Sequence, residues 1–174
     1  MSGHSKWSKI KHKKGTTDQK RGTLFSKLLA AVAIAARENA DPQANPRLRA
    51  AIDRAKHSQV PTQNIERVIK KLSETENLEE IVVEAYGPEK SALIIEGITD
   101  NKNRTIAELK KLLSDHDAKL ADPGSVLWAF ARAGDSWTPQ FIQPLSPEAQ
   151  ESFTKLIKIC EEHPDIQTIY TNVQ

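Results

Sequence analysis

The sequence predicts an α+β protein in which a helical N-terminal part precedes a part built from both strands and helices. Apolar residues recur with a helical period of about 3.6 up to residue 73, and β-rich runs begin only at residue 81. The charge changes at the same boundary. Residues 1–73 hold 16 Lys/Arg against 5 Asp/Glu, a net charge of +11, and residues 74–174 hold 9 against 18, a net charge of −9. Such asymmetry indicates two units with different partners, the basic one facing a polyanion.

Residues 1–22 read as a basic arm, because they lack apolar periodicity and place seven Lys/Arg and one acid in the first 21 positions. Each cation can neutralise a phosphate and release counterions. Trp7 and His12 can stack on bases, although Trp7 is equally suited to anchor the arm on the folded body. The predicted nucleic-acid contacts of the arm are Lys6, Trp7, Lys9, Lys11, His12, Lys13, Lys14, Lys20 and Arg21.

Residues 23–73 are predicted to form a three-helix domain. The first helix, 23–38, is apolar nearly all round, which is typical of a central helix. Asn45 as N-cap and Pro46 at the first helical position start the second helix, and Pro61 starts the third. Basic side chains of the second helix lie off its buried stripe, where they extend the cationic patch or simply keep the helix soluble. These side chains are Arg47, Arg49 and Arg54.

The same N-terminal region has a competing interpretation as a secretory signal peptide, because LLAAVAIAA follows a basic leader. That interpretation predicts a mature protein without residues 1–36. Lys27 one residue before the apolar run, and the length of the basic region, favour the helix instead. The single cysteine, Cys160, favours a reducing, cytoplasmic location. No apolar run reaches the roughly 18 residues needed to cross a bilayer, so no membrane partner is expected.

After an acidic linker, residues 74–80, the expected α+β domain covers residues 81–174. One helix follows Thr105, which has the capping-box spacing to Glu108, and another starts at Pro147. The expected strands cover residues 81–86, 92–98, 125–131, 140–145 and 166–173. From residue 92 the order is β-α-β-β-α-β, the split βαβ pattern of a ferredoxin-like sandwich, with one extra strand before it.

A second candidate anion site lies in the loop TDNKNRT, residues 99–105, between a strand and a helix start. Turn formation and helix capping by Asp and Asn explain the same residues, and this reading is favoured. The anion-binding candidates of the loop are Asn101, Asn103, Arg104 and Thr105.

The sequence shows no recognisable set of catalytic residues. There is no Ser-His-Asp order and no Gly-rich phosphate loop, and Cys160 lies on an apolar helix face where it reads as a core residue. The five histidines form no paired metal spacing with one another or with Cys160. We therefore expect a protein that is not an enzyme and that uses neither a cofactor nor a metal.

Long motifs along the chain resemble those of a known family. The matching segments are GHSKWSKIKHKK (3–14), DQKRGTLFSKL (18–28), NPRLRAAI (45–52), NIERVIKK (64–71), YGP (86–88), TDNKNRT (99–105), GSVLWAF (124–130) and DIQTIYTNV (165–173). On these motifs the chain is identified as a member of the YebC/PmpR family. The resemblance implies an N-terminal helical domain and two α+β domains, the third inserted within the second. In typical members about 70 residues follow the motif GSVLWAFARAG, whereas Trp137-Thr138-Pro139 follows here almost at once, which predicts a short form without the inserted domain.

The resemblance implies two functions, and the residues themselves suggest a third. Family members are described as transcriptional regulators that bind DNA, although no recognition helix with base-reading side chains is evident in this sequence. Relatives act as translational activators on the ribosome that aid synthesis of proline-rich stretches, and a Lys-rich arm suits structured RNA. The third hypothesis is a protein-interaction module whose arm binds an acidic protein. In the nucleic-acid readings, the acidic C-terminal domain contacts a protein partner; the sequence sets no oligomeric state.

Overall fold

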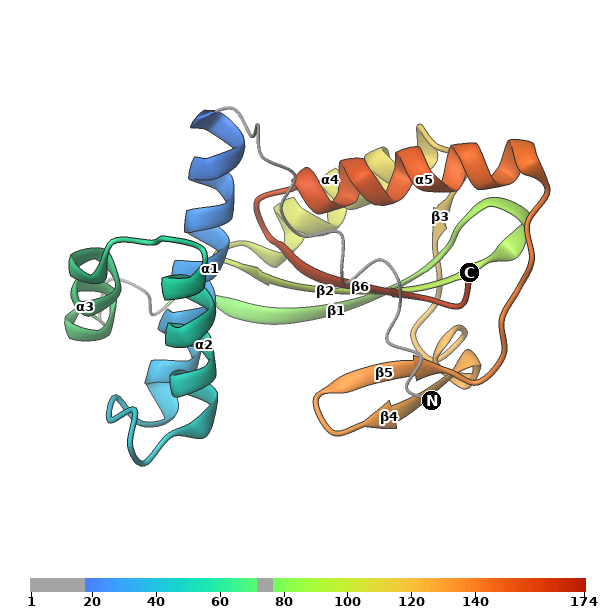
Figure 1. Ribbon diagram of the computed structural model, residues 1–174. Helices are drawn as coiled ribbons and strands as arrows, with labels where there is room; N and C mark the ends of the chain where they lie inside the picture. Colours follow the sequence, from blue (N-terminus) through green and yellow to red (C-terminus); the bar gives the residue numbers. More distant parts are fainter. Residues whose placement is uncertain (1–17, 72–76) are drawn as a thin grey trace.

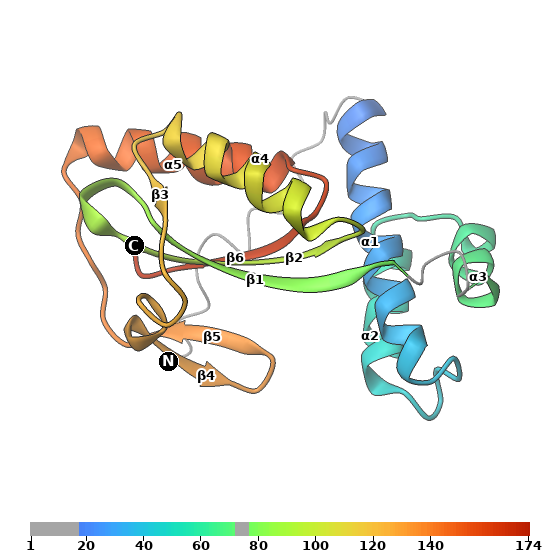
Figure 2. The ribbon, with the colours of Figure 1, turned by 180° about the vertical axis from the view of Figure 1, so that it is seen from behind.

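The structure, a computed structural model, describes residues 18–71 and 77–174. A helical domain forms one end of the molecule, and the other end is a sheet with two helices on one face and a hairpin on the other (Figures 1 and 2). The helices of the first domain are α1 (Asp18–Glu38), α2 (Pro46–His57) and α3 (Thr62–Lys70). In the described residues, no helix combines the length and the apolar character needed to cross a membrane.

The three helices enclose a small core to which α1 contributes Val32, Ala35 and Ala36. Asn45 caps α2 as predicted, since its side chain accepts a hydrogen bond from the Leu48 N–H at 2.9 Å. The same buried side chain donates to the Ala35 carbonyl oxygen at 2.8 Å, which ties the end of α1 to the start of α2. The first helix begins at Asp18, five residues before the predicted start, because the basic segment continues it without a break.

The main sheet contains β1 (Glu79–Tyr86), β2 (Ala92–Thr99), β3 (Lys119–Leu120) and β6 (Ile166–Thr171), in the order β3-β1-β2-β6 with every neighbouring pair antiparallel. A short 3₁₀ turn, η3 (Pro88–Lys90), links β1 to β2. The helices α4 (Lys102–Ser114) and α5 (Pro147–Glu162) cover one face (Figure 1). The α+β class is thereby confirmed.

The strand predicted as an extra one is a central member of the sheet. The βαβ unit of β2, α4 and β3 leaves one strand position between its two strands, and β1 fills it. This is the position that the third strand of a ferredoxin-like sheet occupies. Consequently residues 140–145, which were predicted to supply that strand, are not part of the main sheet.

The strands predicted at 125–131 and 140–145 are wrong. The first segment contains a 3₁₀ turn, η4 (Leu127–Ala129), followed by the hairpin β4 (Phe130–Ala133) and β5 (Ser136–Pro139), which form a separate two-stranded sheet. Val126 and Phe130 are buried, but Trp128 is 64% exposed and stacks on exposed Phe141, so the apolar alternation did not mark one face of a strand. Residues 140–145 make a single bridge, from Gln143 to Val173, and Pro144 has no N–H for a ladder.

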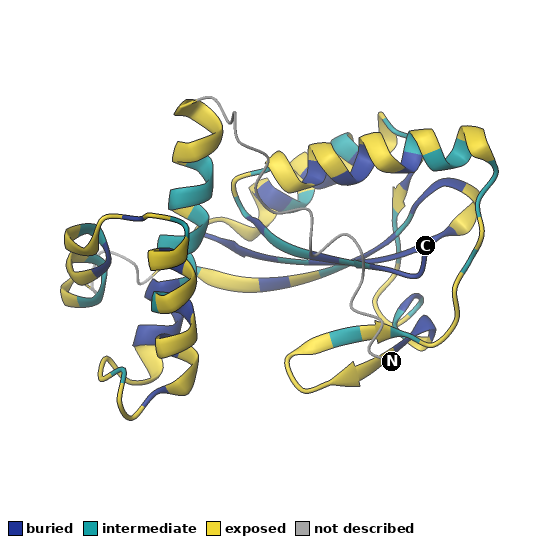
Figure 3. Ribbon diagram, viewed as in Figure 1, coloured by how far each residue is buried: buried dark blue, intermediate teal, exposed yellow. Residues whose placement is uncertain are grey.

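Buried residues line the space between the sheet and the two helices (Figure 3). Phe153, Leu156 and Cys160 of α5 are among them, which confirms Cys160 as a core residue. Burial raises the pKa of the Cys160 thiol to about 12, so the thiolate needed for nucleophilic chemistry is suppressed.

Candidate nucleic-acid interface

The structure describes only the last residues of the basic arm. Lys6, Trp7, Lys9, Lys11, His12, Lys13 and Lys14 lie outside the described residues, so their contacts stay predictions. Lys20 and Arg21 are described and lie on the first turn of α1. The Lys20 ammonium pairs with Glu162 at 2.6 Å, whereas the exposed Arg21 guanidinium lies over the Phe25 ring, 5.3 Å from its centroid. Arg21 is therefore the better placed of the two to meet an anion.

The three arginines of α2 have different surroundings. Arg47 pairs with Glu38 at 2.7 Å and also with Glu80, so it joins α1, α2 and β1. Partial burial alone would lower the pKa of Arg47, but the two carboxylates raise it, which favours the paired cation. Arg49 makes one long hydrogen bond, 3.5 Å to the Pro42 carbonyl oxygen, and Arg54 is exposed without an ion pair in the described part of the chain. Arg49 and Arg54 thus have no carboxylate partner in the described part of the chain, whereas Arg47 is held by two carboxylates.

Two cations of α3 belong to the same domain but were absent from the predicted site. Arg67 and Lys70 are exposed on the side of α3 opposite buried Ile65. Their spacing relative to Ile65 is visible in the sequence and could have identified them. They add to the positive charge of the helical domain.

In the loop predicted as a second anion site, the side chains of Asn101 and Arg104 already bind groups of this chain. The helix α4 starts at Lys102, and Asn101 is its N-cap, accepting from the Arg104 N–H at 3.1 Å; the predicted capping box at Thr105 is therefore wrong. The Asn101 side chain satisfies the free amide of Arg104 in the first turn, and Thr105 lies inside the helix, where its N–H donates to the Asn101 carbonyl oxygen at 3.1 Å. Arg104 pairs with Asp100 and with Asp165, both at 2.8 Å. With these carboxylates around its one arginine, the loop offers little attraction to an anion; the side chain of Asn103 is exposed.

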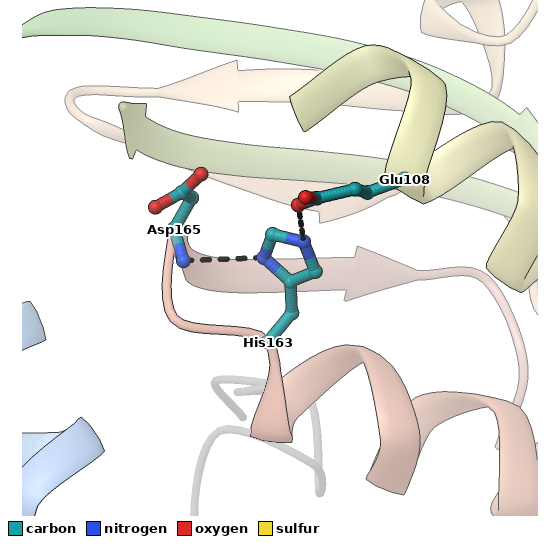
Figure 4. Close-up of side chains that lie close together, drawn as sticks. All are labelled: Glu108, His163 and Asp165. Carbon is teal, nitrogen blue, oxygen red and sulfur yellow. Dashed lines mark hydrogen bonds and ion pairs between the residues drawn. The ribbon is translucent and has the colours of Figure 1, made fainter. Parts of the chain in front are cut away.

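Glu108, His163 and Asp165 bring three groups of metal-ligand type together, with ligand atoms within 4.8 Å of one another (Figure 4). His163 Nε2 lies 3.0 Å from Glu108, and Nδ1 accepts from the Asp165 N–H at 3.2 Å. Burial alone would raise the pKa of Asp165, but hydrogen bonds from Thr105 and Arg104 outweigh it and lower the pKa. The cation held by these carboxylates is the Arg104 guanidinium, and the cluster fastens α4 to the loop before β6.

One of the places where the helical domain is fixed to the α+β domain is the meeting of α1 with the end of α5 and with β6. Lys27 Nζ donates to the Glu161 carbonyl oxygen at 2.5 Å, and Gln167 donates to the Lys27 carbonyl oxygen at 3.2 Å. A cavity of about 290 Å³ opens beside Lys27, between these helices. Burial lowers the pKa of Lys27 to about 8, and the nearby Glu161 and Asp165 only partly offset this effect.

The depressed pKa of Lys27 makes the stability of this junction depend on pH. The folded protein loses the Lys27 proton near pH 8, whereas the unfolded chain keeps it up to its ordinary pKa of 10.5. Between these values the unfolded state binds more protons, so this group makes the free energy of unfolding rise with pH. We expect the difference in unfolding free energy between wild type and Lys27→Met, measured by urea titration, to increase from pH 8 to 10.5. A difference that stays constant from pH 7 to 11 would contradict the assignment.

Comparison with known proteins identifies the family to which this sequence is similar. Residues 5–75 match the profile of the TACO1/YebC protein N-terminal domain, and residues 78–136 match that of the TACO1/YebC second and third domain. A "probable transcriptional regulatory protein" of Chlorobium phaeovibrioides is 52% identical over 143 residues, which cover 80% of this chain and 57% of the relative. A protein of the same name from Desulfosudis oleivorans is 48% identical over 138 residues, 77% of this chain and 56% of the relative.

A solved structure shares the fold of this chain. The crystal structure of the conserved hypothetical protein Aq1575 from Aquifex aeolicus superposes with a TM-score of 0.86 at 28% identity, covering 97% of this chain and 96% of that chain. This chain spans just over half the length of the two curated relatives, which is consistent with a short form. Where the third domain was expected to be inserted, β4 and β5 are joined by a tight turn at Gly134 and Asp135. The chain belongs to the TACO1/YebC family.

Proposed function

We propose that this chain is a nucleic-acid-binding regulator of gene expression that binds a DNA duplex through its basic arm and helical domain. The observation that carries the proposal is the separation of charge between two ends of one molecule. The described residues 18–71 hold 11 Lys/Arg and 5 Asp/Glu, and residues 77–174 hold 9 Lys/Arg and 16 Asp/Glu. These two sets form the helical end and the sheet end, respectively (Figure 1). The name of the curated relatives, a transcriptional regulator, supports the same function.

The separation gives each end a physical role. Cations that neutralise phosphates release condensed counterions, and this release drives association with any duplex. The acidic end is repelled by the same phosphates, so it stays away from the duplex and remains accessible to a protein partner. Arg21, Arg49 and Arg54 are the described residues of the predicted site that remain available for phosphates, beside the five arm lysines that precede Lys20.

The salt dependence of binding tests this proposal. We expect the affinity of the full chain for a duplex of mixed sequence, measured by fluorescence anisotropy, to fall steeply between 50 and 200 mM salt. If five or more cations touch phosphates, the slope of log affinity against log salt is about −4 or steeper, at roughly −0.9 per contact. A flat response would indicate an acidic protein partner instead. Preferential binding to ribosomes in a competition against duplex DNA would indicate a translation factor.

A further inference from the structure

A short turn joins the helices α2 and α3. Four residues separate His57, the last residue of α2, from Thr62, the first of α3. Within this link Gln59 has φ of 63°, in the left-handed region that reverses the chain direction in a short space. The N–H of the next residue, Val60, donates to the Ala55 carbonyl oxygen at 3.0 Å and closes the turn. A link of this length matches the three- to four-residue turn of a helix-turn-helix.

Packing fixes the two helices relative to each other. The Val60 side chain is 4% exposed and fills the corner, and Ala55, on the last turn of α2, is fully buried. Ile65 is buried on the inner side of α3, with Val68 and Ile69 half-buried beside it. All five belong to the core that α1 completes. The unit is therefore rigid enough to present the outer side of α3 in one orientation.

The outer side of α3 carries side chains that have no partner in the described structure. Gln63, Arg67 and Lys70 follow one another at i, i+4 and i+7, which places them on one face, and all three are exposed. Their side chains make no hydrogen bond or ion pair among the residues that the structure describes. Arg47 and Lys20, by contrast, are already paired with acids.

The position of α3 leaves room for a large partner. It lies at the end of the molecule farthest from α5 and the hairpin in both views, and its surface is mostly exposed (Figures 1, 2 and 3). A duplex that approached this end would meet the basic helical domain before the acidic sheet domain. The nine residues of α3 span about 13 Å, a length that suits the roughly 12 Å width of a B-form major groove.

We propose that α3 is the recognition helix of this protein, and that it reads base edges in the major groove of DNA through Gln63 and Arg67. The inference rests on the proposed function and adds a sequence-reading site to it. A glutamine amide pairs with adenine through two hydrogen bonds, and an arginine guanidinium pairs with guanine in the same way. Lys70 lies on the same exposed face of α3 and would meet a flanking phosphate. Duplex RNA does not fit, because its major groove is too narrow and deep for a helix.

The test selects preferred sequences from random DNA duplexes with the full-length wild type, then compares variants on the selected duplex and on a scrambled one. We expect wild type to prefer the selected duplex by about 100-fold or more. The double variant Gln63→Ala/Arg67→Ala should reduce this preference at least about 10-fold while changing affinity for the scrambled duplex by less than roughly 3-fold. Lys110→Ala, which removes the same charge from an exposed face of α4, should leave both affinities unchanged.

Arg67→Lys separates base reading from simple charge. It keeps the positive charge but loses the two-pronged hydrogen bonding, so preference should fall while the salt slope stays the same. The circular dichroism spectrum verifies that each variant is folded. If wild type binds duplexes with a steep salt slope but selects no sequence, or if the α3 variants keep the preference, the recognition helix is refuted and the proposed function stands. If wild type binds no nucleic acid, both are refuted.

Discussion

Replacing Glu84 by alanine is expected to lower the free energy of unfolding by about 3 to 5 kcal/mol, because three amides lose a charged acceptor. The Glu84 side chain lies in the second half of β1 on the face opposite α4 and α5, and the residue is only 8% exposed. Its carboxylate accepts hydrogen bonds from the N–H groups of Gly124 at 2.5 Å, Val126 at 2.7 Å and Leu127 at 3.1 Å. These bonds fix the turn that leads into the hairpin.

Thermal and urea unfolding of the full chain would measure this loss, which corresponds to a fall of roughly 10 °C in melting temperature for a protein of this size. Glu84→Gln keeps one acceptor oxygen and should lose less. Glu148→Ala, at an exposed position in the first turn of α5, is the control and should shift the melting temperature by no more than about 2 °C. A Glu84→Ala protein as stable as this control would show that the three amides find other partners.

The contacts of Glu84 also show why part of the fold could not be predicted from the sequence. Helices that carry their own signals were predictable: Asn45 and Pro46 start α2 because capping and proline geometry are local. The turn at 127–129 was not, because the groups that hold it come from β1, about 40 residues earlier. The same applies to the sheet, where β1 fills the position that a later segment was predicted to occupy. Strand order depends on such distant pairing, which apolar periodicity does not encode.

The candidate site, like the fold, was predictable only in part. Clusters of cations are visible in the sequence, but the acid that each one meets depends on tertiary structure. Arg47 was predicted to bind nucleic acid, and it pairs with Glu38 of α1 and Glu80 of β1. Arg67 was overlooked, although its side chain has no partner in the described structure. The sequence therefore shows where the cations cluster, whereas the surroundings of individual arginines depend on tertiary structure.

Reversing the charge of four arm lysines, Lys9, Lys11, Lys13 and Lys14, to glutamate is expected to abolish binding to duplex DNA at physiological salt. Each lysine that touches a phosphate contributes about 0.9 to the salt slope, so the loss of four contacts reduces its magnitude by roughly 3 to 4 units. The four glutamates would also repel the phosphates. We expect affinity, measured by anisotropy at 150 mM salt, to fall by about 100-fold or more, a loss larger than that from any α3 variant.

The decisive comparison is with a variant that has the same net charge but an intact arm. Reversing Lys102, Lys110, Lys111 and Lys158, which are exposed on α4 and α5, changes the total charge equally. If binding depended on net charge alone, both variants would lose affinity to the same extent. Because close phosphate contacts outweigh distant charges that salt screens beyond about 8 Å, the arm variant should lose binding while the α4/α5 variant largely retains it. Equal losses would show that the arm is a general attractor, and that the contacts with DNA lie in the helical domain itself.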